Sequence, residues 1–96
     1  MVIFYSIHHP VPGKTELLAE SMHRFGEQMA RQPGFIFVAP YPFRDPETGT
    51  LMGVSFWESP EALANARNAL LGGTDDPPAL PLESRPPEVY VLHSVK

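Results

Sequence analysis

Two short junctions constrain the fold of this 96-residue chain more than any other feature. At residues 32–35 (Gln-Pro-Gly-Phe), a proline and a glycine end a helical pattern, and a strand-like run follows. At residues 57–60 (Trp-Glu-Ser-Pro), a strand-like run ends, and the serine and proline fit the N-cap and first position of a helix. The stretch between the junctions has room for one β-hairpin. The chain therefore predicts the element order β-α-β-β-α-β within one domain, residues 1–96.

The remaining patterns give the bounds of these elements. Residues 2–9 and 88–95 are rich in β-branched and aromatic residues and predict the first and last strands. A helix is expected over 14–32, where apolar residues repeat along one face: Leu18, Met22, Phe25 and Met29. Strands are expected over 35–43 and 50–58. The first of these should lie at a sheet edge, because Pro40 and Pro42 cannot donate hydrogen bonds to a neighbouring strand. The second helix should begin at Pro60 and end at the glycine pair 72–73.

Two split β-α-β units with right-handed crossovers make a ferredoxin-like α+β domain. Its antiparallel sheet has the strand order 4-1-3-2, with both helices on one face. The other face should then be polar. In the first, third and last strands, however, both the odd-numbered and the even-numbered positions carry apolar residues. Strands buried on both faces give such sequences, and a large apolar patch marks an association surface. We therefore expect a homodimer in which the two sheets face each other.

The chain resembles the antibiotic-biosynthesis-monooxygenase-like family of the dimeric α+β-barrel superfamily, over residues 1–71 and 88–95. The resemblance rests on the Pro-Gly pair at 12–13, the Pro-Gly-Phe junction at 33–35 and the Trp-Glu-Ser junction at 57–59. It implies a substrate cleft between the sheet and the helices of each subunit. Relatives use this cleft for cofactor-independent oxygenation of aromatic polyketides or for haem breakdown.

Haem-degrading relatives carry an asparagine on the first strand, where this chain has Ser6. They also have a tryptophan in the second helix and a histidine just after it, and this chain has neither. The resemblance therefore favours a protein without a cofactor.

Composition narrows the possible partners. The net charge is −4 with 7 Lys+Arg and no basic run, which argues against nucleic acid and anionic membrane surfaces as partners. The absence of cysteine excludes thiol nucleophiles, disulfides and thiolate metal sites. The chain also has no spaced His/Asp/Glu cluster, phosphate loop or nucleophile elbow, so no metal site is expected. No targeting segment or long apolar span stands out, and a cytoplasmic location is the default expectation.

Strand parity predicts the wall of the cleft. Gly53, Ser55 and Trp57 share one face of the third strand, and two small side chains beside a large one leave space for a ligand. The equivalent positions on the first strand are Phe4, Ser6 and His8. The helix face of Met22, Phe25 and Met29 would form the opposite wall. Met52, Val54 and Phe56, on the other parity, would face the partner subunit.

Cofactor-free oxygenation requires a base that removes a proton, so that the resulting carbanion reduces dioxygen directly. We assign His93 as the base, Trp57 as the residue that stacks on an aromatic substrate, and Ser6 as a hydroxyl donor. Other roles stay open: Trp57 as core, His93 as a structural histidine, and His8 as an exposed one. His8 and His93 lie at opposite ends of their strands and cannot meet on one small ligand.

Residues 72–87 hold five prolines and show no periodicity. They fit a solvated connector, a lid over a pocket or an arm that packs on a partner chain. The functional hypothesis is a monooxygenase-like enzyme acting on a small aromatic or polyketide-like compound. A non-catalytic small-molecule-binding or regulatory dimer is the main alternative, and isomerase or lyase chemistry in the same cleft is a third.

Overall fold

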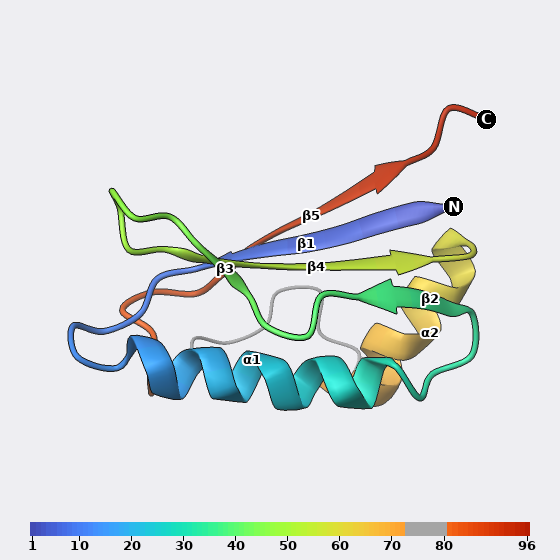
Figure 1. Ribbon diagram of the computed structural model, residues 1–96. Coiled ribbons are helices and arrows are strands. Elements are labelled where there is room, and N and C mark those ends of the chain that lie inside the picture. Colours follow the sequence, from blue (N-terminus) through green and yellow to red (C-terminus); the bar gives the residue numbers. More distant parts are fainter. Residues whose placement is uncertain (73–80) are drawn as a thin grey trace.

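The computed structural model describes residues 1–72 and 81–96 and contains one antiparallel sheet with two helices on one of its faces (Figure 1). The elements, in chain order, are β1 (Val2–His8), α1 (Thr15–Met29), β2 (Phe35–Val38), β3 (Phe43–Arg44), β4 (Leu51–Trp57), α2 (Pro60–Leu71) and β5 (Glu88–His93). The strands lie in the order β2-β4-β1-β5, and β3 also pairs with β4. This confirms the predicted ferredoxin-like fold and its strand order.

The structure corrects three predicted boundaries. The strand expected over 35–43 is two short strands, because the segment that carries Pro40 and Pro42 leaves the sheet between them. Both strands pair with β4, along the edge of β4 that faces away from β1. The first helix ends at Met29 rather than residue 32, and the last strand ends at His93 rather than residue 95.

The two junctions fold as their residues require. Ser59 has an extended backbone, and its Oγ accepts the N–H of Ala62 at 3.1 Å, while Pro60 opens α2. Gly34 has φ +82°, and a Cβ built on it would lie 2.4 Å from the Cβ of Ala62. Both the backbone angle and this contact require glycine at position 34. The junction between α1 and β2 therefore packs directly on the start of α2.

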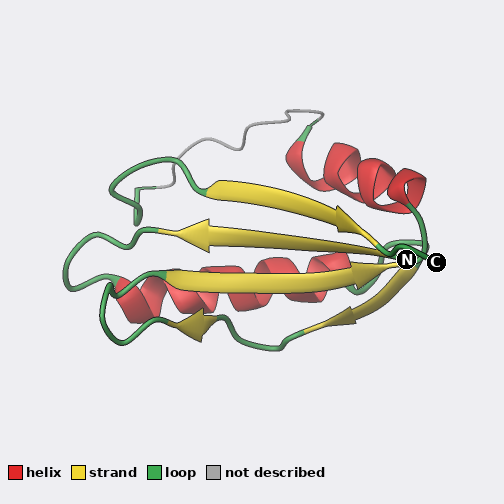
Figure 2. Cartoon of the chain, turned by 90° about the horizontal axis from the view of Figure 1, so that it is seen from above, coloured by secondary structure: helices red, strands yellow, loops and turns green. Residues whose placement is uncertain are grey.

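β1 is the central strand, and it pairs with β4 and β5 along nearly its whole length. Val2 lies opposite both Trp57 and His93, while Ser6 lies opposite both Gly53 and Val89. These pairings set which residues share each end of the sheet. Seen from above, β5, β1, β4 and β2 lie side by side, with α1 behind them and α2 beside the edge formed by β5 (Figure 2).

A small core fills the space between one end of the sheet and α2. Trp57 is 0% exposed and packs among five other core residues: Val2, Phe4, Met29, Leu63 and Ala66. Its ring meets Phe35 edge-on, with centroids 5.7 Å apart. Its indole N–H donates to Ser55 Oγ at 2.9 Å. This end of the molecule is therefore closed by packed side chains.

The sheet face opposite the helices carries exposed apolar side chains. Tyr5 and Tyr90 stack on this face with centroids 4.9 Å apart. Strand alternation places several exposed apolar residues beside them: Phe37, Phe43, Met52 and Leu92. None of the helices in the described ranges is both long and apolar enough to cross a membrane.

Candidate functional site

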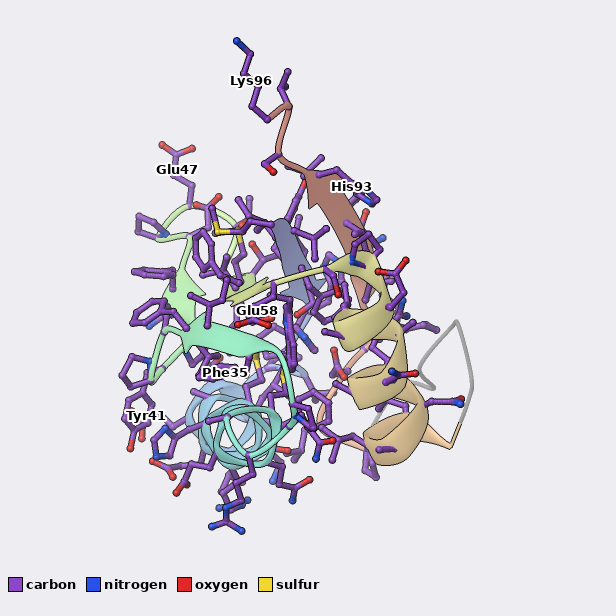
Figure 3. All side chains as sticks on the ribbon, turned by 90° about the vertical axis from the view of Figure 1, so that its right-hand side faces the viewer. Phe35, Tyr41, Glu47, Glu58, His93 and Lys96 are labelled. Carbon is purple, nitrogen blue, oxygen red and sulfur yellow. The ribbon has the colours of Figure 1, made fainter. Side chains whose placement is uncertain are left out.

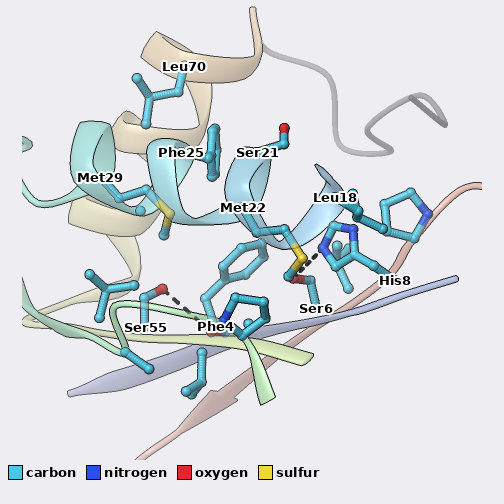
Figure 4. Close-up of a pocket in the computed structure, with 18 of the residues that line it drawn as sticks. Phe4, Ser6, His8, Leu18, Ser21, Met22, Phe25, Met29, Ser55 and Leu70 are labelled. Carbon is cyan, nitrogen blue, oxygen red and sulfur yellow. Dashed lines mark hydrogen bonds between the residues drawn. The ribbon is translucent and has the colours of Figure 1, made fainter. Parts of the chain in front are cut away.

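A cavity of about 410 Å³ lies between the helix-facing side of the sheet and α1 (Figure 4). Ser6 and every residue expected to bind substrate line it: Phe4, His8, Met22, Phe25, Met29, Gly53 and Ser55. Strand alternation explains this arrangement, because positions 4, 6 and 8 of β1 share one face with positions 53 and 55 of β4. Most of the wall is apolar, as in ligand cavities generally.

The polar groups of the wall are concentrated at the end of β1. His8 Nε2 lies 2.8 Å from Ser6 Oγ, and His8 Nδ1 lies 2.8 Å from Glu83 Oε1. Ser6 and His8 are two residues apart on a strand, so both side chains point into the cavity. The three side chains form a hydrogen-bonded chain from carboxylate to imidazole to hydroxyl.

Glu83 is the member of this chain that sequence reasoning missed. It comes from the segment expected only to be a connector, lid or arm, whose residues 73–80 lie outside the described part. The end that is described returns to β1: Val11 N–H donates to the Leu82 carbonyl at 2.9 Å, and Ser84 N–H donates to the His9 carbonyl at 2.8 Å. These bonds flank an isolated bridge between Pro10 and Glu83. Backbone pairing therefore fixes the position of the carboxylate.

The two titratable side chains of this hydrogen-bonded chain, His8 and Glu83, are shielded from water. The side chain of Glu83 is 1% exposed and that of His8 is 15% exposed. Among the described residues, Glu83 Oε2 has no hydrogen-bond partner, so Glu83 is compensated mainly through its contact with His8. An isolated buried carboxylate would be costly, and the imidazole offsets part of that cost.

Burial lowers the pKa of His8, and the charge and hydrogen bond of Glu83 oppose this shift without cancelling it. The imidazole is therefore mainly neutral at pH 7. An ionised carboxylate only accepts hydrogen bonds, so Glu83 selects the tautomer with a proton on Nδ1. The lone pair of Nε2 then faces the Ser6 hydroxyl, which is the arrangement of a general base directed into the cavity.

Two residues assigned from the sequence lie away from the cavity. His93 is exposed at the end of β5, and Figure 3 shows it well apart from α1. The register places it opposite Val2, at the other end of β1 from His8. Trp57 has the expected parity, but α2 covers it and its N–H is taken by Ser55. The proposed base and stacking residue are therefore not brought together with the rest of the site.

The two remaining histidines do not line the cavity. His9 Nε2 lies 2.9 Å from a carboxylate oxygen of Glu88. His23 stacks on Tyr41 with centroids 4.2 Å apart, and its Nδ1 is hydrogen-bonded to the Pro40 carbonyl. Within residues 1–72 and 81–96, no group of three or more His, Asp or Glu side chains could hold a metal ion.

The fold and the position of its cavity define a class of proteins. No protein-family model matches the chain, and no curated protein matches its sequence. Solved structures do match it, and they show that the chain has the fold of the antibiotic biosynthesis monooxygenase structures. This confirms, at the level of fold, the resemblance drawn from the sequence.

Three of these structures illustrate the range of proteins with this fold. Rv0793 from Mycobacterium tuberculosis is 18% identical with a TM-score of 0.73, over 99% of this chain and 95% of that one. SnoaB, a cofactor-independent oxygenase from Streptomyces nogalater, is 19% identical with a TM-score of 0.66, over 99% and 93%. The heme-degrader MhuD from Mycobacterium tuberculosis, with two hemes bound in its active site, is 18% identical with a TM-score of 0.74, over 100% and 97%.

Proposed function

We propose that the protein is a cofactor-independent monooxygenase acting on a small aromatic compound, with His8 as the general base. The observation that carries this proposal is a neutral imidazole, oriented by a buried carboxylate, in the wall of an apolar cavity of about 410 Å³. The similarity in fold to the cofactor-independent oxygenase SnoaB supports the class of reaction. His8 and Glu83 thus replace His93 in the role that the sequence suggested.

The size and lining of the cavity favour a compact aromatic substrate. Ligand cavities typically range over about 300–1,000 Å³. Phe4 and Phe25 offer aromatic surfaces to a planar ring, and Met22 offers a flexible apolar one. The polar group of the substrate would then lie near Ser6 and His8, at the end of β1.

The reaction can be written for an anthrone-type substrate, whose methylene group is acidified by the adjacent aromatic system. His8 Nε2 takes one methylene proton, and Glu83 stabilises the imidazolium that forms. The carbanion transfers an electron to dioxygen, and the two recombine to form a C–O bond. The peroxide takes the proton from His8 and loses water, which leaves a carbonyl at the former methylene carbon. One O₂ is consumed and one H₂O is released per substrate.

Haem chemistry fits this site less well. Both ring nitrogens of His8 are engaged, one with Glu83 and the other with Ser6. No other histidine of the described residues lines the cavity, so the wall offers no free imidazole nitrogen to an iron atom. This agrees with the departures from the haem-degrading pattern in the sequence.

The test is oxygen uptake with anthrones and hydroquinones, comparing the wild type with His8→Gln and His93→Gln. We expect the wild type to consume oxygen, His8→Gln to lose about 10²-fold or more in rate, and His93→Gln to keep it. Loss of activity in His93→Gln alone would return the base assignment to His93. Ligand binding without oxygen uptake in the wild type would instead support the non-catalytic binder.

We also propose that the protein is a homodimer formed through the outer face of the sheet. The exposed apolar side chains on this face, among them Phe43 and Leu92, support a buried location in an assembly. Sedimentation equilibrium measures the mass in solution, and a chain that stays monomeric at micromolar concentration would refute the proposal. The cytoplasmic location expected from the sequence remains a prediction.

A further inference from the structure

We propose a second activity for the same cavity: Ser6 is a nucleophile that accepts the acyl group of small activated esters, with His8 as its base. This activity goes beyond the proposed oxygenation and does not depend on it. It requires no dioxygen, and the two activities share the cavity and the His8–Glu83 pair. The ligand class is a small aryl ester whose apolar parts fit the cavity.

The geometry places three groups in the order that nucleophilic serine chemistry needs. The Ser6 hydroxyl lies 2.8 Å from His8 Nε2, and His8 Nδ1 lies 2.8 Å from Glu83 Oε1. A serine becomes nucleophilic when an adjacent base takes its proton and a third group orients the base. This arrangement is recognised by geometry, and it does not require a nucleophile elbow in the sequence.

Ser21 also lines the cavity, from α1, but no hydrogen bond among the described residues joins it to His8. Three other serines of the described residues have structural hydrogen bonds instead. Ser55 Oγ accepts the Trp57 indole N–H at 2.9 Å and contacts the Phe4 carbonyl at 3.5 Å. Ser59 caps α2, and Ser84 Oγ donates to the His9 carbonyl at 3.2 Å. The hydroxyl of Ser6 is bonded to a neutral imidazole and lies in a cavity wall.

A glycine keeps the approach to Ser6 open. Gly53 lies directly opposite Ser6 on β4. A Cβ built at position 53 would lie 3.5 Å from Ser6 Oγ and 3.1 Å from Met22 Cε. Any side chain at position 53 would therefore occupy the space beside the hydroxyl, where an acyl carbon must approach.

The step is a conventional acyl transfer. Ser6 Oγ attacks the ester carbonyl carbon, and its proton passes to His8 Nε2. The C–O bond to the leaving group breaks, and the departing phenolate takes that proton. A water molecule then attacks the acyl-serine with His8 again as base, and this releases a carboxylic acid and restores Ser6.

Both halves of this cycle should be slow, and the second slower, because the aryl ester has a phenolate leaving group whereas the acyl-serine is an unactivated alkyl ester. β1 pairs with a strand on each side around Ser6, so its backbone amides are committed to the sheet. They cannot form the pair of N–H donors that normally stabilises a tetrahedral oxyanion, which is worth about 10²–10³-fold in rate per donor. We therefore expect a long-lived covalent adduct rather than efficient hydrolysis.

The experiment measures covalent modification of the full chain by a fluorophosphonate and by p-nitrophenyl butyrate. Intact-mass spectrometry gives the stoichiometry, and peptide mapping gives the position. We expect one adduct per chain, located on Ser6. Ser6→Ala should give no adduct, and Ser84→Ala, the matched control on an exposed serine, should react as the wild type does. His8→Gln keeps the Ser6 hydroxyl but removes its base, and it should react about 10²-fold more slowly than the wild type.

An unmodified wild type, an adduct on another residue, or equal rates in wild type and His8→Gln would overturn the proposal. Circular dichroism of Ser6→Ala establishes that its loss of reaction is not a loss of fold. Ser6→Cys supplies a second check, because a thiol beside His8 should react with iodoacetamide faster than free cysteine. The labelling is carried out without oxygen and without an anthrone or hydroquinone, so its failure and the failure of oxygen uptake are separate results.

Discussion

Replacing Trp57 by alanine tests whether this residue belongs to the core or to the substrate site. Its side chain is 0% exposed, contacts Phe35 edge-on, and donates one buried hydrogen bond to Ser55. Truncating a buried tryptophan to alanine typically costs about 3–5 kcal/mol. A chain of 96 residues is expected to have a total stability of about 5–14 kcal/mol, at roughly 0.05–0.15 kcal/mol per residue. The variant should therefore lose a large share of its stability.

The assay is urea unfolding at one fixed protein concentration, because self-association would add a concentration-dependent contribution to the measured stability. Trp57→Phe is the matched control: it keeps an aromatic ring and removes the indole N–H. We expect it to cost about 1–2 kcal/mol, near the value of one buried hydrogen bond plus a small volume change. A loss below about 1.5 kcal/mol in Trp57→Ala, with an unchanged m-value, would refute the core assignment. That result would instead support the assignment of Trp57 as the residue that stacks on an aromatic substrate.

Three further predictions concern the site, a junction and the outer face. Glu83→Gln removes the negative charge that raises the pKa of His8, so that pKa should fall further. A protonated base is inactive, so the acid limb of the pH profile of oxygen uptake should then move to lower pH. The maximal rate should fall, because the imidazolium is no longer stabilised. An unchanged profile would contradict this role of Glu83. Gly34→Ala should destabilise the chain by about 2–4 kcal/mol, because it combines a positive φ with a clash against Ala62. Gly13 is the control: its φ is +83°, but the space around it is open, so Gly13→Ala should cost only about 1–2 kcal/mol. Thermal unfolding measures both losses. Equal costs at the two glycines would count against the clash. Leu92→Glu should dissociate the proposed dimer in sedimentation equilibrium with little change in secondary structure, while Glu88→Gln on the same strand should leave the mass unchanged.

The pH dependence of stability follows from the same histidine. The pKa of His8 in the folded chain lies below its ordinary value of 6.5, so the unfolded chain takes up the proton more readily. The contribution of His8 to stability is complete above pH 6.5 and declines as the pH falls from there towards the lowered value. His8→Gln should flatten this part of the stability curve in denaturant titrations at several pH values.

The parts of the fold that depend on local chemistry could be predicted from the sequence. The junctions at Gly34 and Ser59 depend on backbone angles and capping, which only a few residue types satisfy. Strand alternation correctly grouped Phe4, Ser6 and His8 with Gly53 and Ser55, because successive side chains of a strand alternate between faces. Periodicity also placed Met22, Phe25 and Met29 on the helix face that lines the cavity.

The parts that depend on distant contacts could not be predicted. Trp57 shares its parity with Gly53, but α2 packs over this end of the sheet, and parity alone does not show where a helix lies. Glu83 gives no local signal, because it lies in a proline-rich stretch without periodicity. Its role depends on the backbone bonds that join residues 82 and 84 to the end of β1. A hint was available, since the segment preceding β5 must return to the end of β1 where His8 lies.

The central position of β1 has a consequence for how the chain folds. β1 leaves the ribosome well before β5, and the two pair through partners as far apart as Val2 and His93. Such non-local pairings require the closure of long loops before they contribute stability, and they slow folding. Until residues 88–93 have been synthesised, one edge of β1 has no partner, and the carboxylate that orients His8 has barely emerged. Nascent chains should therefore remain open to edge-to-edge association until β5 has emerged, and the hydrogen-bonded chain of Glu83, His8 and Ser6 should be complete only then.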